Sequence, residues 1–283
     1  MLATVHHFDF AGLLHPVAFI NCESLYPYMF TILRDWGMEK FDPGDDKPPI
    51  ITIQKTTAGF ERRSRWLSKP AISRNPVDAV CDLIVDLTHA YVADNKGLLC
   101  LHCAAVEFNQ GLVVFPNTYR AGKSTLSLKL VSGGARLFTD DVLPISNQGD
   151  FGLALGILPR MRLPLPQEIT PGFADFVTTR AGPQNSRYLY VKLGMNEQAA
   201  LGTAAPIRGV TILQREKNAG AELLKAKKSL VVKDMILRNF ARQNPGLEII
   251  NRLYAIVENA ECYSLRYDNL DQAVDLLEDA FGS

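Results

Sequence analysis

The residues best suited to chemistry lie in one segment, FPNTYRAGKSTL at residues 115–126. Its second half, Gly122-Lys123-Ser124, fits the end of the phosphate-binding pattern G-x-x-x-x-G-K-[ST]. Asn117 stands where that pattern has its first glycine, and asparagine is one of the few other residues that tolerate positive φ. Backbone amides and a helix N-terminus bind phosphate oxygens in such loops. We therefore expect a nucleotide site formed by Asn117, Arg120, Ala121, Gly122, Lys123, Ser124 and Thr125.

Two adjacent acids, Asp140 and Asp141, follow the strand-like run ARLFT. Adjacent carboxylates raise the pKa of one member, which favours a division between a metal ligand and a proton acceptor. The alternative is a solvated acid pair that opens a turn. We favour the functional interpretation, in which one acid of the pair is the base and the other, together with the Ser124 hydroxyl, is a ligand of Mg²⁺.

His102 lies in the apolar run CLHCAAVEF, where strand alternation places it on the face opposite Leu101 and Cys103. It is either a hydrogen-bonded core residue or a member of the site. Cys100 and Cys103 form a C-x-x-C pair, but an odd offset on a strand points the two thiols to opposite faces, which disfavours joint metal binding.

Three arginines downstream, Arg160 and Arg162 in LPRMRLPLP and Arg187 in SRYLYVKL, could reach a phosphate or an acidic substrate. The interpretation we favour for alternating arginines is the polar face of an edge strand. Arg120, inside the loop, is either a phosphate clamp or a solvated side chain.

The elements around the loop have the order that phosphate binding requires. The sequence predicts a strand over 97–108, a second strand over 111–116, a helix that begins at Lys123 and ends at Gly133-Gly134, and the strand ARLFT before the acids. A strand, a Gly-Lys-Ser loop, a helix and a strand ending in an acid form the context of a P-loop.

The remaining segments predict a mixed α/β (α+β) fold with two domains, an N-terminal α+β lobe at 1–95 and a P-loop domain at 96–283. The lobe contains the strand IITIQKT and closes with a helix over 75–95 capped by Asn75. The other predicted elements are the strands RYLYVKL, GVTILQRE and AECYSLRY and the helices SLVVKDMILRNFARQ and NLDQAVDLLEDAFGS, with the basic run LLKAKKSL as a solvated hairpin arm.

Composition excludes several classes of function. The 283 residues carry 30 basic and 30 acidic side chains, so no global field favours nucleic acid or an anionic membrane. Apolar runs fall far short of the roughly 18 residues of a membrane span, and no secretory signal is apparent. Five cysteines, an odd number, fit a reducing compartment, so we expect a cytoplasmic protein. Both a monomer and a homo-oligomer are compatible with the sequence.

The span 99–145 resembles the catalytic core of the HPr kinase/phosphorylase family and its HPr-kinase-related members. Three features match in order: His102, the Gly122-Lys123-Ser124 loop, and the Asp140-Asp141 pair. The resemblance implies a nucleotide-binding fold like that of phosphoenolpyruvate carboxykinase and transfer of a phosphoryl group to a serine hydroxyl. It also implies that Lys123 contacts the phosphates, that Ser124 helps to hold Mg²⁺ and that His102 lines the site. One acid of the pair is implied to be the base, and the family pattern favours Asp140 for that role and Asp141 as the metal ligand.

The sequence departs from that family at several points. Asn117 and Arg120 replace glycines of the loop, and no glycine-rich, glutamate-containing segment follows, so neither phosphorolysis nor HPr as substrate is carried over. We expect an ATP- and Mg²⁺-dependent kinase whose acceptor is a hydroxyl, favoured as serine of a protein, a peptide or a free amino acid. The alternatives are a nucleotide-binding regulatory or scaffold protein without turnover and a P-loop NTPase. ATP, ADP and pyrophosphate all remain compatible as donors.

Overall fold

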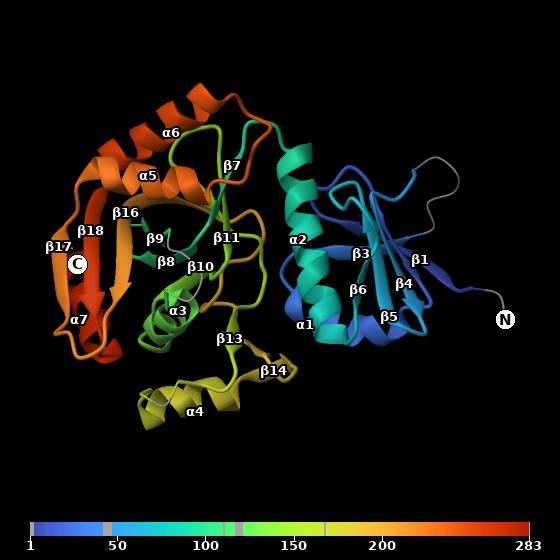
Figure 1. Ribbon diagram of the computed structural model, residues 1–283, viewed down its shortest axis with the longest axis horizontal. Helices are drawn as coiled ribbons and strands as arrows, with labels where there is room; N and C mark the ends of the chain where they lie inside the picture. The colour runs from blue at the N-terminus through green and yellow to red at the C-terminus, as the bar shows by residue number, and fades with distance from the viewer. Residues whose placement is uncertain (1–2, 42–46, 110, 117–120, 167, 283) are drawn as a thin grey trace.

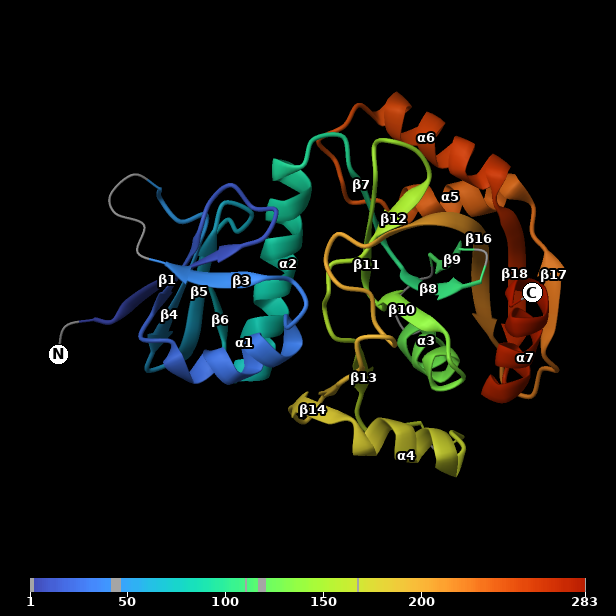
Figure 2. The same cartoon turned by 180° about the vertical axis from the view of Figure 1, so that it is seen from behind.

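The computed structural model describes residues 3–282 except 42–46, 110, 117–120 and 167, and it shows a mixed α+β fold (Figure 1). Three sheets contain the strands of the described residues. In two opposite views, one long helix, α2 (Pro76–Asp94), stands between the first sheet and the rest of the chain (Figures 1 and 2). Among the described residues, no helix is both long and apolar enough to cross a membrane.

The N-terminal part, within residues 1–95, forms a six-stranded sheet backed by α2 and the short helix α1 (Tyr26–Ile32). Its strands are Val5–Phe10 (β1), Val17–Ile20 (β2), Met38–Phe41 (β3), Ile51–Thr56 (β4), Gly59–Ser64 (β5) and Ala71–Ser73 (β6), in the spatial order β3-β1-β2-β4-β5-β6. The predicted helix over 75–95 and the predicted strand IITIQKT are confirmed. The Asn75 side chain caps α2 by accepting a hydrogen bond from the amide of Asp78 at 2.9 Å.

Helix α2 is tied to its own sheet by a buried ion pair. Arg62 of β5 contacts Asp86 of α2 at 2.5 Å and donates a further hydrogen bond to the Asp82 carbonyl at 2.6 Å. Both charged side chains are almost completely buried. The apolar core of this part also contains Leu155, Leu158 and Tyr190, so the core continues into the second part of the chain.

The second sheet has nine strands and carries the predicted P-loop. Its strands are Leu99–His102 (β7), Ala104–Phe108 (β8), Gly111–Phe115 (β9), Arg136–Thr139 (β10), Val142–Ile145 (β11), Phe151–Leu153 (β12), Ala204–Arg215 (β16), Glu222–Lys225 (β17) and Glu261–Tyr267 (β18). Seven follow the order β10-β8-β9-β16-β12-β11-β7, and β18 pairs with β16 and β17.

Helices cover both faces of the nine-stranded sheet. The helices are α3 (Lys123–Ser132), α5 (Lys228–Arg238), α6 (Gly246–Asn259) and α7 (Leu270–Phe281). Strand β9 explains the layering, because Leu112 and Val114 pack in the core with α5 and α6, whereas Val113 and Phe115 pack with α3 and α7. The sequence of a strand that is buried on both faces is a continuous apolar run, as in GLVVF.

One predicted strand, over 97–108, is in fact two strands that belong to distant places in the sheet. It breaks at Cys103, and the run that follows β10 breaks in the same way at Asp140-Asp141. The breaks face each other, since the Cys103 amide donates to the Asp141 carbonyl at 2.9 Å and Val142 is in register with His102. These two kinked strands bring the histidine and the acid pair together although nearly forty residues separate them in sequence.

The two ends of the seven-strand order are covered by short segments of the same chain. The backbone of Leu137 in β10 exchanges two hydrogen bonds, both of 2.8 Å, with residues 197–199. In β7, the Cys100 carbonyl accepts from the Phe240 amide at 3.0 Å, and the Cys100 amide donates to the Asn239 side chain at 3.2 Å. The outer backbone groups of both end strands are thereby engaged at these positions.

A third, small sheet lies beside α2, and α4 (Pro171–Thr179) lies below this sheet at the bottom of the view (Figure 1). Its strands, in spatial order, are Arg160–Arg162 (β13), Tyr188–Val191 (β15) and Ala181–Gln184 (β14). The position of β13 at the edge confirms the edge-strand prediction for LPRMRLPLP, while its arginines take part in the site described below.

The C-terminal elements agree only in part with the sequence prediction. The closing helix α7 is confirmed, with the Asn269 side chain accepting from the Gln272 amide at 3.0 Å. The helix predicted through SLVVKDMILRNFARQ ends at Arg238, because the backbone of the following residues turns to cover β7, and Phe240 therefore lies outside it. Helices α4 and α6 were not predicted.

Candidate functional site

The N-terminus of α3 contains the Gly122-Lys123-Ser124 sequence that was predicted to bind phosphate. Strand β9 ends at Phe115, and the chain enters α3 through Gly122, whose φ of +85° is in the left-handed region that favours glycine. A Cβ at this position would lie 2.9 Å from the hydroxyl of Tyr267 in β18. Lys123 and Ser124 then begin the helix, whose first amides and dipole attract an anion. Asn117 and Arg120 lie outside the described residues.

Asp140 is the buried member of the acid pair, with 7% of its surface exposed. Its carboxylate accepts a hydrogen bond from the Arg160 amide at 3.0 Å and another from the Ser124 side chain. Burial, followed by the charge of Asp141, raises the pKa of Asp140 to about 6, although both hydrogen bonds act in the opposite direction. The protein thus holds a carboxylate beside the N-terminus of α3 in a setting that disfavours its charge.

Asp141 is the accessible member, with its side chain 38% exposed. One oxygen lies 3.2 Å from His102 Nδ1, and the other lies 3.3 Å from the Arg160 guanidinium. The predicted alternation is confirmed here, since Leu101 and Cys103 are fully buried and His102 is not. Partial burial lowers the pKa of His102, and the Asp141 charge opposes that effect. His102 and Arg160 therefore fix Asp141 from two sides.

Lys123 is buried beside these acids, with 8% of its surface exposed. Desolvation lowers the pKa of its ammonium, and the negative charges of Asp141 and Asp140 partly restore it. The charge of Lys123 adds to the positive end of the α3 dipole, and both favour an anion at this place. Phosphate oxygens have the required charge.

A cavity of about 990 Å³ joins all these groups. The predicted residues that line it are His102, Ala121, Gly122, Lys123, Ser124, Thr125, Asp140 and Asp141. Its further walls come from α2, through Ile84, Val85 and Thr88, and from the small sheet, through the segment around Arg160 and Tyr188. This volume is at the upper end of the usual range for ligand sites, so the cavity is large enough to hold a second group in addition to a triphosphate.

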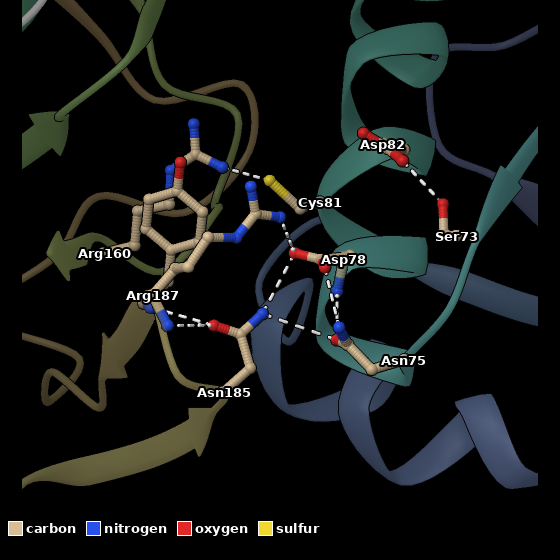
Figure 3. A network of polar contacts seen from close by, with 9 residues as sticks. Ser73, Asn75, Asp78, Cys81, Asp82, Arg160, Asn185 and Arg187 are labelled. Atoms are coloured by element: carbon tan, nitrogen blue, oxygen red, sulfur yellow. Dashed lines mark hydrogen bonds and ion pairs between the residues drawn. The ribbon is translucent and has the colours of Figure 1, made fainter. Parts of the chain in front are cut away.

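Figure 3 shows how α2 and the small sheet meet at this cavity. The Arg160 guanidinium donates a hydrogen bond to the thiol of Cys81 in α2. One turn earlier, Asp78 accepts from Arg187 at 2.8 Å and from the Asn185 side chain at 3.0 Å. The N-terminal part of the chain is therefore a wall of the site, although its sequence contains none of the predicted site residues.

From the sequence, the favoured interpretation of Arg160 and Arg187 was the polar face of an edge strand. Arg160 instead contacts Asp141, and both arginines line the cavity. The sequence signal for Arg160 is weak, because Arg160 and Arg162, with one apolar residue between them, fit an edge strand equally well. The contribution of α2 has no local signal at all, since Asp78 and Cys81 meet their partners only through tertiary packing.

The oxygen atoms available as metal ligands are suited to a nucleotide with Mg²⁺. Carboxylate and hydroxyl oxygens from Asp140, Asp141 and Ser124 are hard ligands, and Mg²⁺ is commonly held by one or two carboxylates together with substrate phosphates. Among the described residues no group of three or more His, Cys, Asp or Glu side chains could hold a metal by itself. A magnesium site here would therefore need the hydroxyl and the phosphate oxygens as well.

Comparison with known proteins adds no assignment: no family model matches the sequence, and no curated protein matches it either.

Proposed function

We propose that this protein is a kinase that transfers the γ-phosphoryl group of ATP to a hydroxyl, with serine as the favoured acceptor. The observation that carries the proposal is the acid pair. Asp140 interacts with the Ser124 side chain at the start of α3. Asp141 faces the same cavity and is in contact with His102 and Arg160. A metal-binding carboxylate and a substrate-accessible carboxylate in one cavity are the two acidic groups that phosphoryl transfer uses.

The contacts support roles for the two acids that are the reverse of those predicted from the sequence. Asp140 is buried and shares a hydrogen bond with Ser124, which suits a ligand of the metal that the Ser124 hydroxyl would also hold. Asp141 is exposed to the cavity, so an acceptor hydroxyl can approach it. Geometry takes priority over pKa in choosing a general base, and it favours Asp141.

The proposed step uses groups of this chain in fixed places. The acceptor oxygen forms a bond to the γ-phosphorus, the bond from that phosphorus to the oxygen of ADP breaks, and the hydroxyl proton passes to Asp141. Lys123 and the first amides of α3 bind the phosphate oxygens, and His102 and Arg160 orient Asp141. Bound Mg²⁺ would supply neutralisation of phosphate charge, held by Ser124 and Asp140.

The walls of the cavity favour transfer to an acceptor over hydrolysis. Water needs no binding surface, whereas this cavity extends past the acids to the apolar residues Ile84 and Val85 of α2. The other two functions, nucleotide binding without turnover and nucleotide hydrolysis, are outcomes of the same test.

The test is to titrate the protein with ATP in the presence and absence of Mg²⁺ and to follow radiolabel from γ-labelled ATP into serine, serine peptides and inorganic phosphate. We expect Mg²⁺-dependent binding and label in an acceptor. Lys123→Ala should abolish transfer and weaken ATP binding, whereas Lys192→Ala, at an exposed lysine outside the cavity lining, serves as the matched control. Unchanged ATP affinity in Lys123→Ala would contradict the nucleotide site, and label in phosphate alone would indicate a hydrolase.

A further inference from the structure

Three guanidinium groups surround a single aromatic ring on the wall of the cavity that faces α2. The carbon atoms of the Arg160, Arg162 and Arg187 guanidiniums lie 5.0, 5.6 and 5.4 Å from the centroid of the Tyr188 ring. All four side chains line the cavity. We call Arg160, Arg162 and Arg187 the arginine cluster. A tyrosine ring attracts each cation, but cations gathered so closely also repel one another and favour an anion among them.

The cluster has donors to offer such an anion. A guanidinium carries five N–H donors, and the ion pair from Arg187 to Asp78 at 2.8 Å engages one terminal nitrogen. The Arg187 side chain remains 62% exposed. Arginine also matches the planar, two-oxygen geometry of a carboxylate, which lysine does not.

The cluster lies on the acceptor side of the cavity. The phosphates are expected at Lys123 and the N-terminus of α3, whereas Arg160 and Arg187 reach across to Cys81 and Asp78 of α2 (Figure 3). Arg160 also lies 3.3 Å from Asp141. An anion bound by Arg160 is therefore only a few bonds from a hydroxyl presented to Asp141.

The charge of the neighbouring acid limits what kind of anion suits this place. A carboxylate carries one negative charge and meets less repulsion from Asp141 than a phosphate dianion would. We propose that the arginine cluster is the acceptor subsite and that the acceptor carries a carboxylate a few bonds from the hydroxyl that is phosphorylated. This inference rests on the proposed function, because it is that function which makes the cavity an acceptor site.

Two sources could supply such a carboxylate: the free α-carboxylate of a hydroxy amino acid, or the side chain of an acidic residue beside the hydroxyl residue in a peptide. Two matched ligand pairs separate them. L-serine is compared with L-serinamide, and N-acetyl-Ser-Asp-amide is compared with N-acetyl-Ser-Asn-amide. Binding to the full chain is measured by ligand-observed NMR at millimolar concentration, and phosphoryl transfer is measured separately with Mg²⁺ and ATP.

We expect the acidic member of one pair to bind at least about tenfold more tightly than its neutral partner, as charge-assisted hydrogen bonds imply. In the double variant Arg162→Gln/Arg187→Gln this preference should fall to about twofold or less, while Arg63→Gln should retain it. Arg63 is a suitable control because it is 65% exposed, pairs with Glu61 and lies on β5 outside the cavity lining.

Equal affinity within both pairs, no binding of either acidic ligand, or a preference that survives the double variant would each overturn the inference. Thermal denaturation of the double variant checks that it is folded, and the single variants Arg162→Gln and Arg187→Gln replace it if it is not. Charge-dependent binding without any phosphoryl transfer would refute the kinase proposal and leave the anion subsite standing. Transfer without charge preference would refute the subsite alone.

Discussion

Replacing Asp140 with asparagine is expected to stabilise the protein when no ligand has been added. Burial and the neighbouring Asp141 raise the pKa of Asp140 from 3.8 to about 6, so folding disfavours its charged form. Asparagine has nearly the same shape and keeps an oxygen that can accept from the Arg160 amide at 3.0 Å. The substitution therefore removes a charge whose burial costs free energy and leaves the surrounding contacts in place.

The magnitude follows from the size of the pKa shift. A shift of about 2 units corresponds to about 3 kcal/mol at a pH above both values. Because the folded state binds the proton more tightly than the unfolded state, this penalty is absent below about pH 4, grows as the pH rises, and is complete above about pH 6. Wild-type stability should thus fall across that window by up to about 3 kcal/mol relative to Asp140→Asn, roughly 5 °C in Tm.

The assay is thermal and urea denaturation of both proteins in EDTA at several pH values between about 4 and 7.5. Asp175→Asn, at an exposed aspartate of α4, is the matched control and should follow the wild type throughout. Adding ATP with Mg²⁺ should then stabilise the wild type more than Asp140→Asn, because the bound cation offsets the buried charge. A variant that is no more stable than the wild type at neutral pH, with the same pH dependence, would refute the reasoning.

Three further predictions follow from the site and its support. Asp141→Asn should keep Mg²⁺-dependent ATP affinity and reduce transfer at least about a hundredfold, as loss of a general base does; a fully active variant would remove Asp141 from that role. Gly122→Ala should lose about 1–2 kcal/mol of stability and bind ATP more weakly, because φ is +85° and the new methyl group would meet the Tyr267 hydroxyl. In the double variant Gly122→Ala/Tyr267→Phe, only the part of the lost stability that is due to this contact should be recovered. Denaturation measures the stability, and ATP titration measures the binding. Asp86→Ala should destabilise the fold by about 3 kcal/mol or more, because it leaves Arg62 buried without its partner, whereas the exposed Asp175→Ala should not; a urea midpoint equal to that of the wild type would contradict this.

The parts of the fold that local chemistry specifies were predictable. Helix α2 has Asn75 as its cap and Pro76 at its first position, and α7 has Asn269 at the same place. The order of β9, α3 and β10 followed from one apolar strand, one Gly-Lys-Ser sequence and one acid-terminated strand. Each of these signals lies within a few residues of the element that it defines.

The parts that depend on long-range packing were not predictable. The break at Cys103 leaves the apolar pattern of 97–108 intact, so nothing in the sequence separates β7 from β8. Helix α6 is a different case, because Ile249, Leu253 and Ile256 recur at helical spacing and could have indicated it. The placement of Arg160 beside Asp141 required the fold of the small sheet, which no short segment encodes.

The covered ends of the seven-strand order, β10 and β7, restrict how any polypeptide could be recognised near the acids. Strand addition needs a row of backbone amides and carbonyls still open to a new partner. Beside the kinked strands those groups are engaged at Leu137 by residues 197–199 and at Cys100 by Asn239 and Phe240. A peptide that approaches the acids along these two end strands must then be recognised through its side chains or its terminal groups. A surface of that kind contacts functional groups rather than an extended main chain. It can therefore bind a short metabolite and a residue of a protein through the same contacts.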